Sequence, residues 1–288
     1  MKTLLKIVAV LVVLVVVGVT VLFMYIDSIA RKGIEVAATN ALGVQTTLRS
    51  ADVGIMAGTF DMQGLNVANP AGFQTAHFLN LGEGNVQVSL NTLSQQTVEL
   101  PYLKLTAIDV NLEKKDGKSN YNVILDNVKK NESGGSSPSS PSDKKFVVRE
   151  ITIKDIKVHV DLLPIGGDAA KLDVPIDEIK LTNVGSGTDG GMLMKDLVPT
   201  IVKAVLAAVV QKGGDIIPKE LLGDLEGSLA QLKSLESLGV GMTAELGKGI
   251  EGIAKGAGEA GKAVEQVGEG VKKAAEGLKD LIPGKKKD

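Results

Sequence analysis

The sequence predicts an α+β fold: an N-terminal transmembrane helix, a curved antiparallel β-sheet that forms a groove with short helices, and C-terminal amphipathic helices. Three observations lead to this prediction. A run of 20 uncharged, mostly aliphatic residues comes near the start of the chain. Apolar residues alternate with polar ones through the middle, which is typical of strands with one buried face. Towards the end apolar residues recur at spacings of three and four, which is typical of amphipathic helices.

These changes of pattern divide the chain into six segments. We expect a transmembrane anchor at 1–27, a first β-rich unit at 28–130, a Ser/Pro/Gly-rich linker or loop at 131–145, a second β-rich unit that completes the sheet at 146–190, apolar helices at 191–240 and a Gly/Ala-rich amphipathic heptad helix at 241–288.

The composition excludes several classes of protein. The 288 residues include 32 basic and 34 acidic side chains, no cysteine and no tryptophan. Without cysteine there is neither a disulfide framework nor a thiolate metal site. No basic patch with interleaved aromatic residues occurs, so we expect no nucleic-acid partner.

The uncharged run covers residues 7–26. A helix of about 20 apolar residues spans the hydrocarbon core of a bilayer. Lys2 and Lys6 precede the run, and positive charge on that side favours a cytoplasmic N-terminus, with the bulk of the chain on the far side of the membrane. A cleaved signal peptide is the alternative, with Ser28-Ile-Ala30 as its cleavage site. The predicted anchor residues are Ile7, Leu11, Leu14, Val17, Val21, Phe23 and Ile26.

After the anchor we expect a short helix at 29–42 that ends at Gly43, and then strands. Three stretches share an apolar spacing of two, three, two. In a strand, a gap of three moves later side chains to the other face unless one extra residue, as in a β-bulge, restores them and bends the strand. The repeat therefore predicts a curved sheet whose groove is lined by Phe60, Met62, Leu65, Val67, Leu103, Leu105, Ile108, Val110, Ile151, Ile153, Ile156 and Val158.

A partial fourth copy of this spacing is Ile179, Leu181 and Val184. Pro101 lies within an alternating run and predicts an edge strand or a break, because proline lacks the N–H that a central strand would donate. A short helix is expected at 119–127.

The C-terminal third predicts helices. One is expected at 192–212, with Pro199 opening its main part, and a second at 218–238. A heptad seam then runs from Leu246 to Leu281, but nine glycines within it weaken an isolated helix. Such a helix needs a membrane, the protein's own groove or a partner helix to form; a frayed, solvated tail is the alternative. The seam residues are Leu246, Ile250, Ile253, Val264, Val267, Val271, Leu278 and Leu281.

No motif for catalysis, metal binding or a cofactor appears. His77 and His159 have no second histidine at ligand spacing, and nothing in the sequence pairs Asp109, Asp155 and Asp161 as acid and base. We therefore expect no enzyme activity and no cofactor.

One stretch, GTFDMQGLNVANPAGF at 58–73, is followed by the turn KDGK at 115–118 and by Asn120 and Tyr121 at the start of a helix. With the N-terminal anchor, this order resembles the N-terminal unit of the AsmA-like family of bacterial envelope proteins, over about residues 1–185. The resemblance implies an inner-membrane protein whose bulk is periplasmic and whose curved β-groove offers an apolar surface to lipid. The chain is shorter than the large relatives of this family, which are thought to bridge membranes.

Two functional hypotheses follow. In the first, the groove binds or shields membrane lipid, in envelope maintenance or lipid handling. In the second, the protein is a structural tether that holds a protein partner, or a second copy of itself, through its C-terminal helices.

Overall fold

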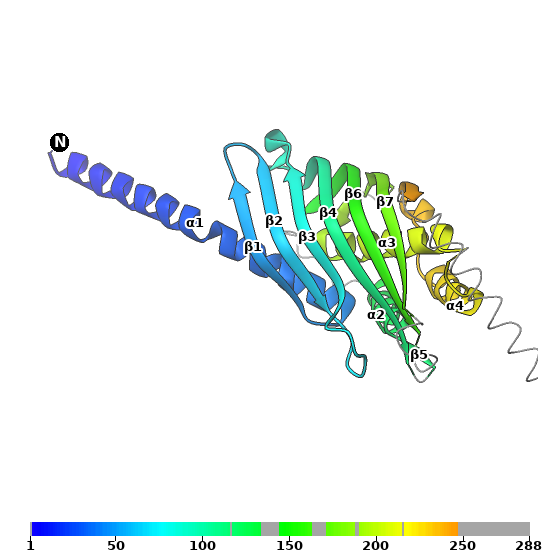
Figure 1. Ribbon diagram of the computed structural model, residues 1–288. Coiled ribbons are helices and arrows are strands. Elements are labelled where there is room, and N and C mark those ends of the chain that lie inside the picture. Colours follow the sequence, from blue (N-terminus) through cyan, green and yellow to red (C-terminus); the bar gives the residue numbers. More distant parts are fainter. Residues whose placement is uncertain are drawn as a thin grey trace, which may run out of the picture.

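The computed structural model describes residues 2–115, 117–133, 144–162, 171–187, 190–214 and 216–246. Helix α1 (Lys2–Leu42) leads into the strands β1 (Thr46–Gly54), β2 (Thr59–Ala68) and β3 (His77–Gln87) (Figure 1). The remaining elements, in chain order, are η1 (Leu90–Thr92), β4 (Thr97–Lys115), β5 (Lys118–Ser119), α2 (Asn120–Ser133), β6 (Lys145–Leu162), β7 (Lys171–Val184), β8 (Met192–Leu193), α3 (Met194–Lys212), α4 (Lys219–Ala230), η3 (Glu236–Leu238) and β9 (Gly241–Leu246).

The strands form one open sheet of mixed direction, so the predicted α+β class is confirmed. Its order is β1-β2-β3-β4-β6-β7-β9, with β5 beside β4 and β8 beside β6. All neighbours are antiparallel except β4 and β6, which are parallel, so the expectation of a wholly antiparallel sheet is wrong at that pair. A parallel pair needs a crossover, and β5 and α2 belong to the connection between these two strands.

A crease crosses the sheet at one level. Six strands, β1, β2, β3, β4, β6 and β7, have one unpaired residue between two consecutive paired rows. The rows are Leu48–Leu65–Leu81–Ile108–Ile156–Ile176 and Ser50–Gln63–Glu83–Thr106–Lys154–Glu178. We call these unpaired residues the crease; they are Arg49, Gly64, Gly82, Ala107, Asp155 and Asp177.

The crease explains the apolar spacing of two, three, two. In β2, β4 and β6 the crease residues Gly64, Ala107 and Asp155 have φ of 66°, 60° and 55°, in the left-handed region. This conformation costs a residue with a side chain about 1–2 kcal/mol. The extra residue keeps the apolar residues before and after it on one face, and each fully buried Leu or Ile contributes about 1.5–3 kcal/mol. The burial gained therefore outweighs the local strain.

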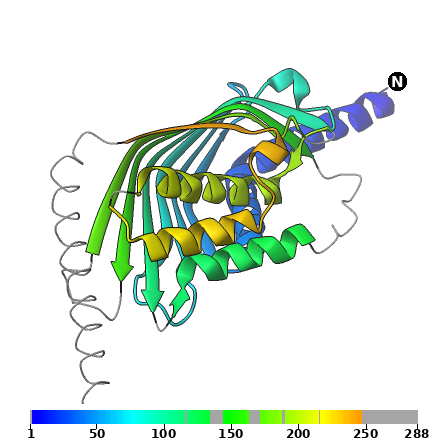
Figure 2. The ribbon, with the colours of Figure 1, turned by 90° about the vertical axis from the view of Figure 1, so that its right-hand side faces the viewer.

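Helices fill the concave side of the bent sheet. Figure 2 shows the strands curling over α3, with α2 and α4 nearby on the same side. Helix α3 is buried on most of its surface, and its Ala204, Ala208 and Val209 have no exposed area. Small residues at these positions let the helix approach the sheet closely, which makes α3 the centre of the core.

Helix α1 covers the edge of the sheet. Its Asp27, Glu35 and Thr39 accept hydrogen bonds from the backbone N–H groups of Val53 (2.9 Å), Leu48 (2.9 Å) and Thr46 (3.0 Å) in β1. The acceptors are eight and four residues apart, so they share one face of the helix. They satisfy edge donors that would otherwise face solvent or another chain.

The structure corrects several predicted boundaries. Helix α1 is continuous to Leu42, where Gly43 with φ of 69° follows it as expected. Strand β4 continues through Pro101, which lies just beyond Tyr102, the last residue paired with β3. In α3, Pro199 lies inside the helix and not at its start. The second predicted helix is shorter, because α4 ends at Ala230.

Two segment assignments also change. The linker predicted at 131–145 overlaps α2, which continues to Ser133, and β6, which begins at Lys145. Gly241–Leu246 forms β9 and pairs with β7, so the heptad helix predicted from 241 does not begin there. Pairing with the open edge of β7 satisfies the N–H and C=O groups on the facing sides of both strands.

Among the residues that the structure describes, no helix is long and apolar enough to cross a membrane.

We predict that Gly64→Ala lowers the free energy of unfolding by about 1–2 kcal/mol, because the left-handed φ disfavours a side chain. A Cβ at this position would also lie 3.0 Å from the Cβ of Arg49. The measurement is urea unfolding of the full chain in detergent micelles. The matched control is Gly223→Ala inside α4, where a Cβ meets nothing within 4 Å and should add about 0.5–1 kcal/mol. Equal effects of both substitutions would contradict the role of the crease.

Candidate functional site

A cavity of about 510 Å³ lies between the concave face of the sheet, α1 and α3. Its walls come from α1, the strands β2, β3 and β4, the first residues of β6 and the first two turns of α3. The size falls within the range of about 300–1,000 Å³ that is usual for small-molecule sites. The cavity is therefore large enough for a ligand.

The chemistry of the cavity is uniform. Every lining residue is apolar: Ala30, Gly33, Ile34, Ala37, Phe60, Met62, Leu65, Val67, Leu79, Leu81, Val86, Val88, Leu100, Leu103, Leu105, Ile108, Phe146, Met194, Leu197, Val198, Ile201 and Val202. Such a cavity offers a ligand neither a hydrogen-bond partner nor a charge. Water in such a cavity finds no hydrogen-bond partner on the walls, whereas apolar atoms gain dispersion contacts with them.

The structure separates the predicted groove residues into two groups. Phe60, Met62, Leu65, Val67, Leu103, Leu105 and Ile108 line the cavity. The others, Val110, Ile151, Ile153, Ile156 and Val158, do not line it and are fully buried within the core. The two copies of the spacing nearest α1 contribute to the cavity, whereas the third belongs to the packed part of the sheet.

Sequence reasoning missed three contributors to the cavity. Strand β3 supplies Leu79, Leu81 and Val86. The gap of five residues between Leu81 and Val86 contains the crease residue Gly82, so these positions do not show the spacing of two, three, two. Helix α1 supplies Gly33 and Ala37, which look like ordinary small helix residues in sequence. Helix α3 meets the cavity through its first two turns, and this contact depends on how the chain folds back on the sheet.

The predicted anchor residues all lie in α1. Ile7, Leu11, Leu14 and Val17 are exposed and Ile26 is half-buried, while the side chains of Val21 and Phe23 lie outside the description. Of the seam residues, Leu246 is the last residue of β9 and the others lie beyond the described residues. The tether hypothesis therefore stays a prediction.

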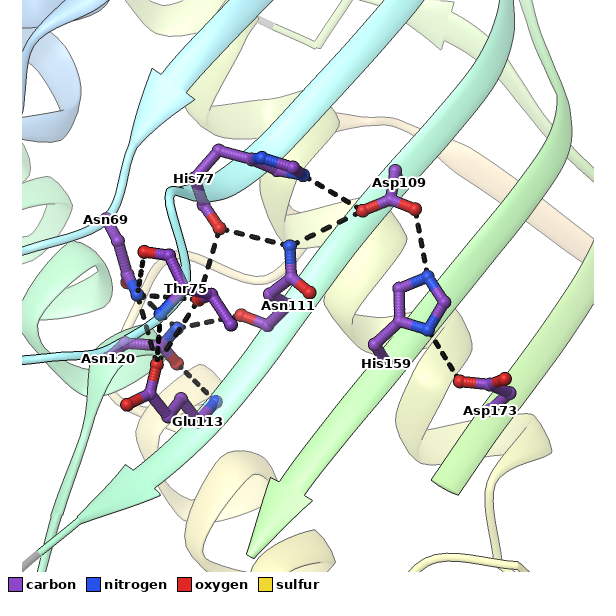
Figure 3. A network of polar contacts seen from close by, with 9 residues as sticks. All are labelled: Asn69, Thr75, His77, Asp109, Asn111, Glu113, Asn120, His159 and Asp173. Atoms are coloured by element: carbon purple, nitrogen blue, oxygen red, sulfur yellow. Dashed lines mark hydrogen bonds and ion pairs between the residues drawn. The ribbon is translucent and has the colours of Figure 1, made fainter. Parts of the chain in front are cut away.

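A chain of polar side chains crosses the opposite face of the sheet (Figure 3). His77 Nε2 lies 3.0 Å from Asp109 Oδ1, and His159 Nε2 lies 2.9 Å from Asp109 Oδ2. The second ring nitrogen of His159 contacts Asp173 of β7. Asp109 follows Ile108 of the cavity wall, so alternation along β4 places its side chain on the other face. Sequence reasoning left Asp109 unpaired because its partners come from other strands.

These contacts set the protonation of Asp109 and His159. Partial burial alone would raise the pKa of Asp109, but hydrogen bonds with His77 and His159 outweigh it and hold that pKa below its ordinary value. Partial burial alone would lower the pKa of His159, but hydrogen bonds with Asp173 and Asp109 raise it above its ordinary value. The charged forms of Asp109 and His159 therefore stabilise each other.

A second polar group is centred on Glu113, whose side chain is fully buried. It accepts hydrogen bonds from the backbone of Gln74 (2.7 and 2.9 Å) and Thr75 (3.1 Å) and from the amide of Asn69 (3.2 Å). Asn120 donates to Asn69 Oδ1 (3.0 Å) and accepts from the backbone N–H of Glu113 (2.9 Å). This satisfies a carboxylate that would be costly to bury unpaired.

The Glu113 group brings together the two motifs that carry the family resemblance. Asn69 belongs to the stretch at 58–73, and Asn120 follows the turn at 115–118. In the structure these motifs hold the loop after β2 against the end of β4 and the start of α2. Their role here is structural, and sequence reasoning had no signal for Glu113 because its donors come from 38–44 residues away.

Neither polar group forms a metal site. Within the described residues, no set of three or more His, Asp or Glu side chains is arranged to hold a metal ion. None of the polar residues in Figure 3 lines the cavity. The cavity is therefore the candidate site for a ligand, and the polar groups join strands and loops.

The fold and the cavity define a class: an α+β protein whose creased sheet curls over an apolar cavity beside a long N-terminal helix. Comparison with known proteins adds no family to this description, since neither a family model nor a curated protein matches the chain.

We predict that the His159 imidazole titrates above the ordinary histidine pKa of about 6.5, as followed by NMR in the full chain. Asp109→Asn should lower that pKa, because it removes one of the two carboxylates. Asp52→Asn on β1 removes the same charge far from His159 and should leave its pKa unchanged. A His159 pKa that does not respond to Asp109→Asn would contradict the arrangement.

The sign of the effect on stability follows from the direction of the shifts. The contribution of His159 is fully present below the unfolded pKa and is lost as the pH rises through the raised folded pKa. The contribution of Asp109 is present above its unfolded pKa and is lost as the pH falls through its lowered folded pKa. Wild-type protein should therefore lose more stability than Asp109→Asn when the pH rises through the His159 titration.

Proposed function

We propose that this protein is a membrane-anchored protein of the bacterial envelope that binds or shields the acyl chains of lipid in its cavity. The observation that carries the proposal is the cavity of about 510 Å³ with no polar lining residue. A hydrocarbon chain loses no hydrogen bond on entering such a space, and it gains the burial of its methylene groups at about 0.8 kcal/mol each. A polar substrate would pay for desolvation without compensation.

The cavity also favours binding over catalysis. Its lining offers no acid, base or nucleophile. General acid–base catalysis requires such groups within hydrogen-bond reach of the reacting atoms. The lack of any polar partner further favours a mode in which the cavity holds the chain of the lipid while its headgroup stays outside.

We propose that the N-terminal half of α1 is the membrane anchor. Residues 7–26 carry no charge, and the described side chains of this run before Ile26, such as Val12 and Leu14, are exposed. The side chains of residues 8, 9, 15, 16 and 19–24 lie outside the description, so the proposal depends on the sequence of the whole run. Lys2 and Lys6 favour a cytoplasmic N-terminus, which leaves the sheet in the periplasm.

The test is to fill the cavity from its helical wall. A Cβ at Gly33 of α1 would meet nothing within 4 Å, so the position opens into space. We predict that Gly33→Trp abolishes lipid binding without loss of folding, because the indole occupies the volume of the acyl chain. Native mass spectrometry with lipid extraction, on the full chain purified in mild detergent, measures the bound lipid.

The matched control is Gly223→Trp in α4, another helical glycine with open space around its Cβ but outside the cavity lining. It should retain the lipid of the wild-type chain. Wild-type protein that carries no lipid, or Gly33→Trp that carries as much lipid as Gly223→Trp, would refute the proposal.

A further inference from the structure

The exposed hydrophobic side chains of the described residues are not spread evenly over the surface. Outside α1, the large ones are Met56 (88% exposed), Leu90 (45%), Leu93 (45%) and Tyr102 (46%). Met56 lies in the hairpin between β1 and β2, and Leu90 and Leu93 lie in the connection between β3 and β4. We call Met56, Leu90 and Leu93 the rim. Tyr102 lies close by, because it pairs with Gln87, the last residue of β3.

The rim is one continuous structure. Val88 donates a backbone hydrogen bond of 2.7 Å to the carbonyl of Gly58 in the hairpin, and a Cβ on Gly58 would lie 3.0 Å from the side chain of Leu90. Lys144 Nζ donates to the carbonyl of Leu93 (3.0 Å) and also to that of Gln95. The two connections therefore hold each other in place and present their apolar side chains together.

The rim lies at the end of the sheet towards which α1 leaves the body (Figure 1). Asp27 of α1 accepts a hydrogen bond from Val53, three residues before Met56. Tyr25 and Ile29, on either side of Asp27, are 58% and 61% exposed. The end of the proposed anchor is thus held beside the hairpin, while the exposed side chains of Tyr25 and Ile29 point away from β1, because residues two apart lie on opposite faces of a helix.

The cavity reaches the same end of the sheet. Phe60 and Val88 line it next to Gly58, and Phe146 and Met194 line it at the starts of β6 and α3. Phe146 pairs with Met192 in β8, directly before α3. The apolar lining of the cavity therefore begins beside the rim.

We propose that the rim is a second membrane contact, seated in the interface of the leaflet from which α1 emerges, and that lipid enters the cavity there. The occupant is the bilayer, because the rim is apolar and lies at the end of the sheet towards which the proposed anchor leaves the body. The backbone groups of the hairpin and of η1 remain at the polar level of the interface, since hydrocarbon cannot satisfy them. Tyr25 and Tyr102 have the amphipathic rings that are enriched at this level. This inference rests on the proposed anchor and deepens the proposed lipid binding by naming the source and the entry.

The lack of tryptophan in the chain allows a direct measurement of depth. Met56→Trp and Leu93→Trp each place a single indole on the rim of the full chain, reconstituted into phosphatidylcholine vesicles with brominated acyl chains. We expect a blue-shifted emission and loss of fluorescence for both. Phe73→Trp, in the loop between β2 and β3 at the other end of the sheet, should show neither effect. Emission from positions 56 and 93 that matches position 73 would overturn the inference.

Val17→Trp in the same vesicles separates this inference from the proposed anchor. Quenching at position 17 without quenching at 56 and 93 overturns the rim contact and leaves the anchor intact. Quenching at 56 and 93 without quenching at 17 supports the rim contact and refutes the anchor.

Uptake of lipid gives an independent test. The double substitution Met56→Glu, Leu93→Glu should abolish loading from vesicles and leave loading from detergent-solubilised lipid unchanged, because the cavity itself is intact. Val36→Glu is the matched control, since Val36 is 55% exposed on α1 away from the rim. Loading from vesicles that equals the control would overturn the inference. If no variant binds lipid from either source, the proposed binding fails, while the fluorescence still decides the rim contact.

Discussion

The crease is the constraint on which the rest of the structure depends. One additional residue at the same level of β1, β2, β3, β4, β6 and β7 keeps the register between neighbours while the whole sheet bends. A flat sheet would present its apolar face to one layer of helices. The bent sheet surrounds α3 on the concave side and leaves, next to α1, a space that the side chains do not fill. The cavity is therefore a consequence of the backbone path as well as of the side chains.

Helix α1 joins the sheet to the uncharged run at residues 7–26. Asp27, Glu35 and Thr39 bind the backbone of β1 along its length, so the helix is joined to the sheet at three levels. Edge strands commonly attract other chains, and here a helix of the same protein occupies that position. The same helix contributes a wall of the cavity, so the direction of the proposed anchor and the orientation of the cavity are fixed together.

The two faces of the sheet have different roles because alternation separates them. In β4, Ile108 lines the cavity while Asp109 joins His77 and His159 on the other face. At the end of this strand, the buried Glu113 accepts five hydrogen bonds from four donor groups of the protein in place of water. These polar groups hold loops and neighbouring strands together. The apolar face therefore needs no polar side chain for that purpose. This separation leaves the cavity chemically uniform.

The sequence by itself determined the α+β class, the bend of the strands and part of the cavity wall, because these depend on local patterns. The spacing of Phe60, Met62, Leu65 and Val67 requires an extra residue, whatever strand lies beside it. Only the tertiary structure decided that β4 and β6 are parallel, that Asp109 meets two histidines and that α1 and α3 complete the cavity. These features depend on which segments meet across 30 or more residues, and no local periodicity encodes that choice. The tertiary structure also decided that residues 241–246 form a strand and not a helix, because this segment pairs with the open edge of β7.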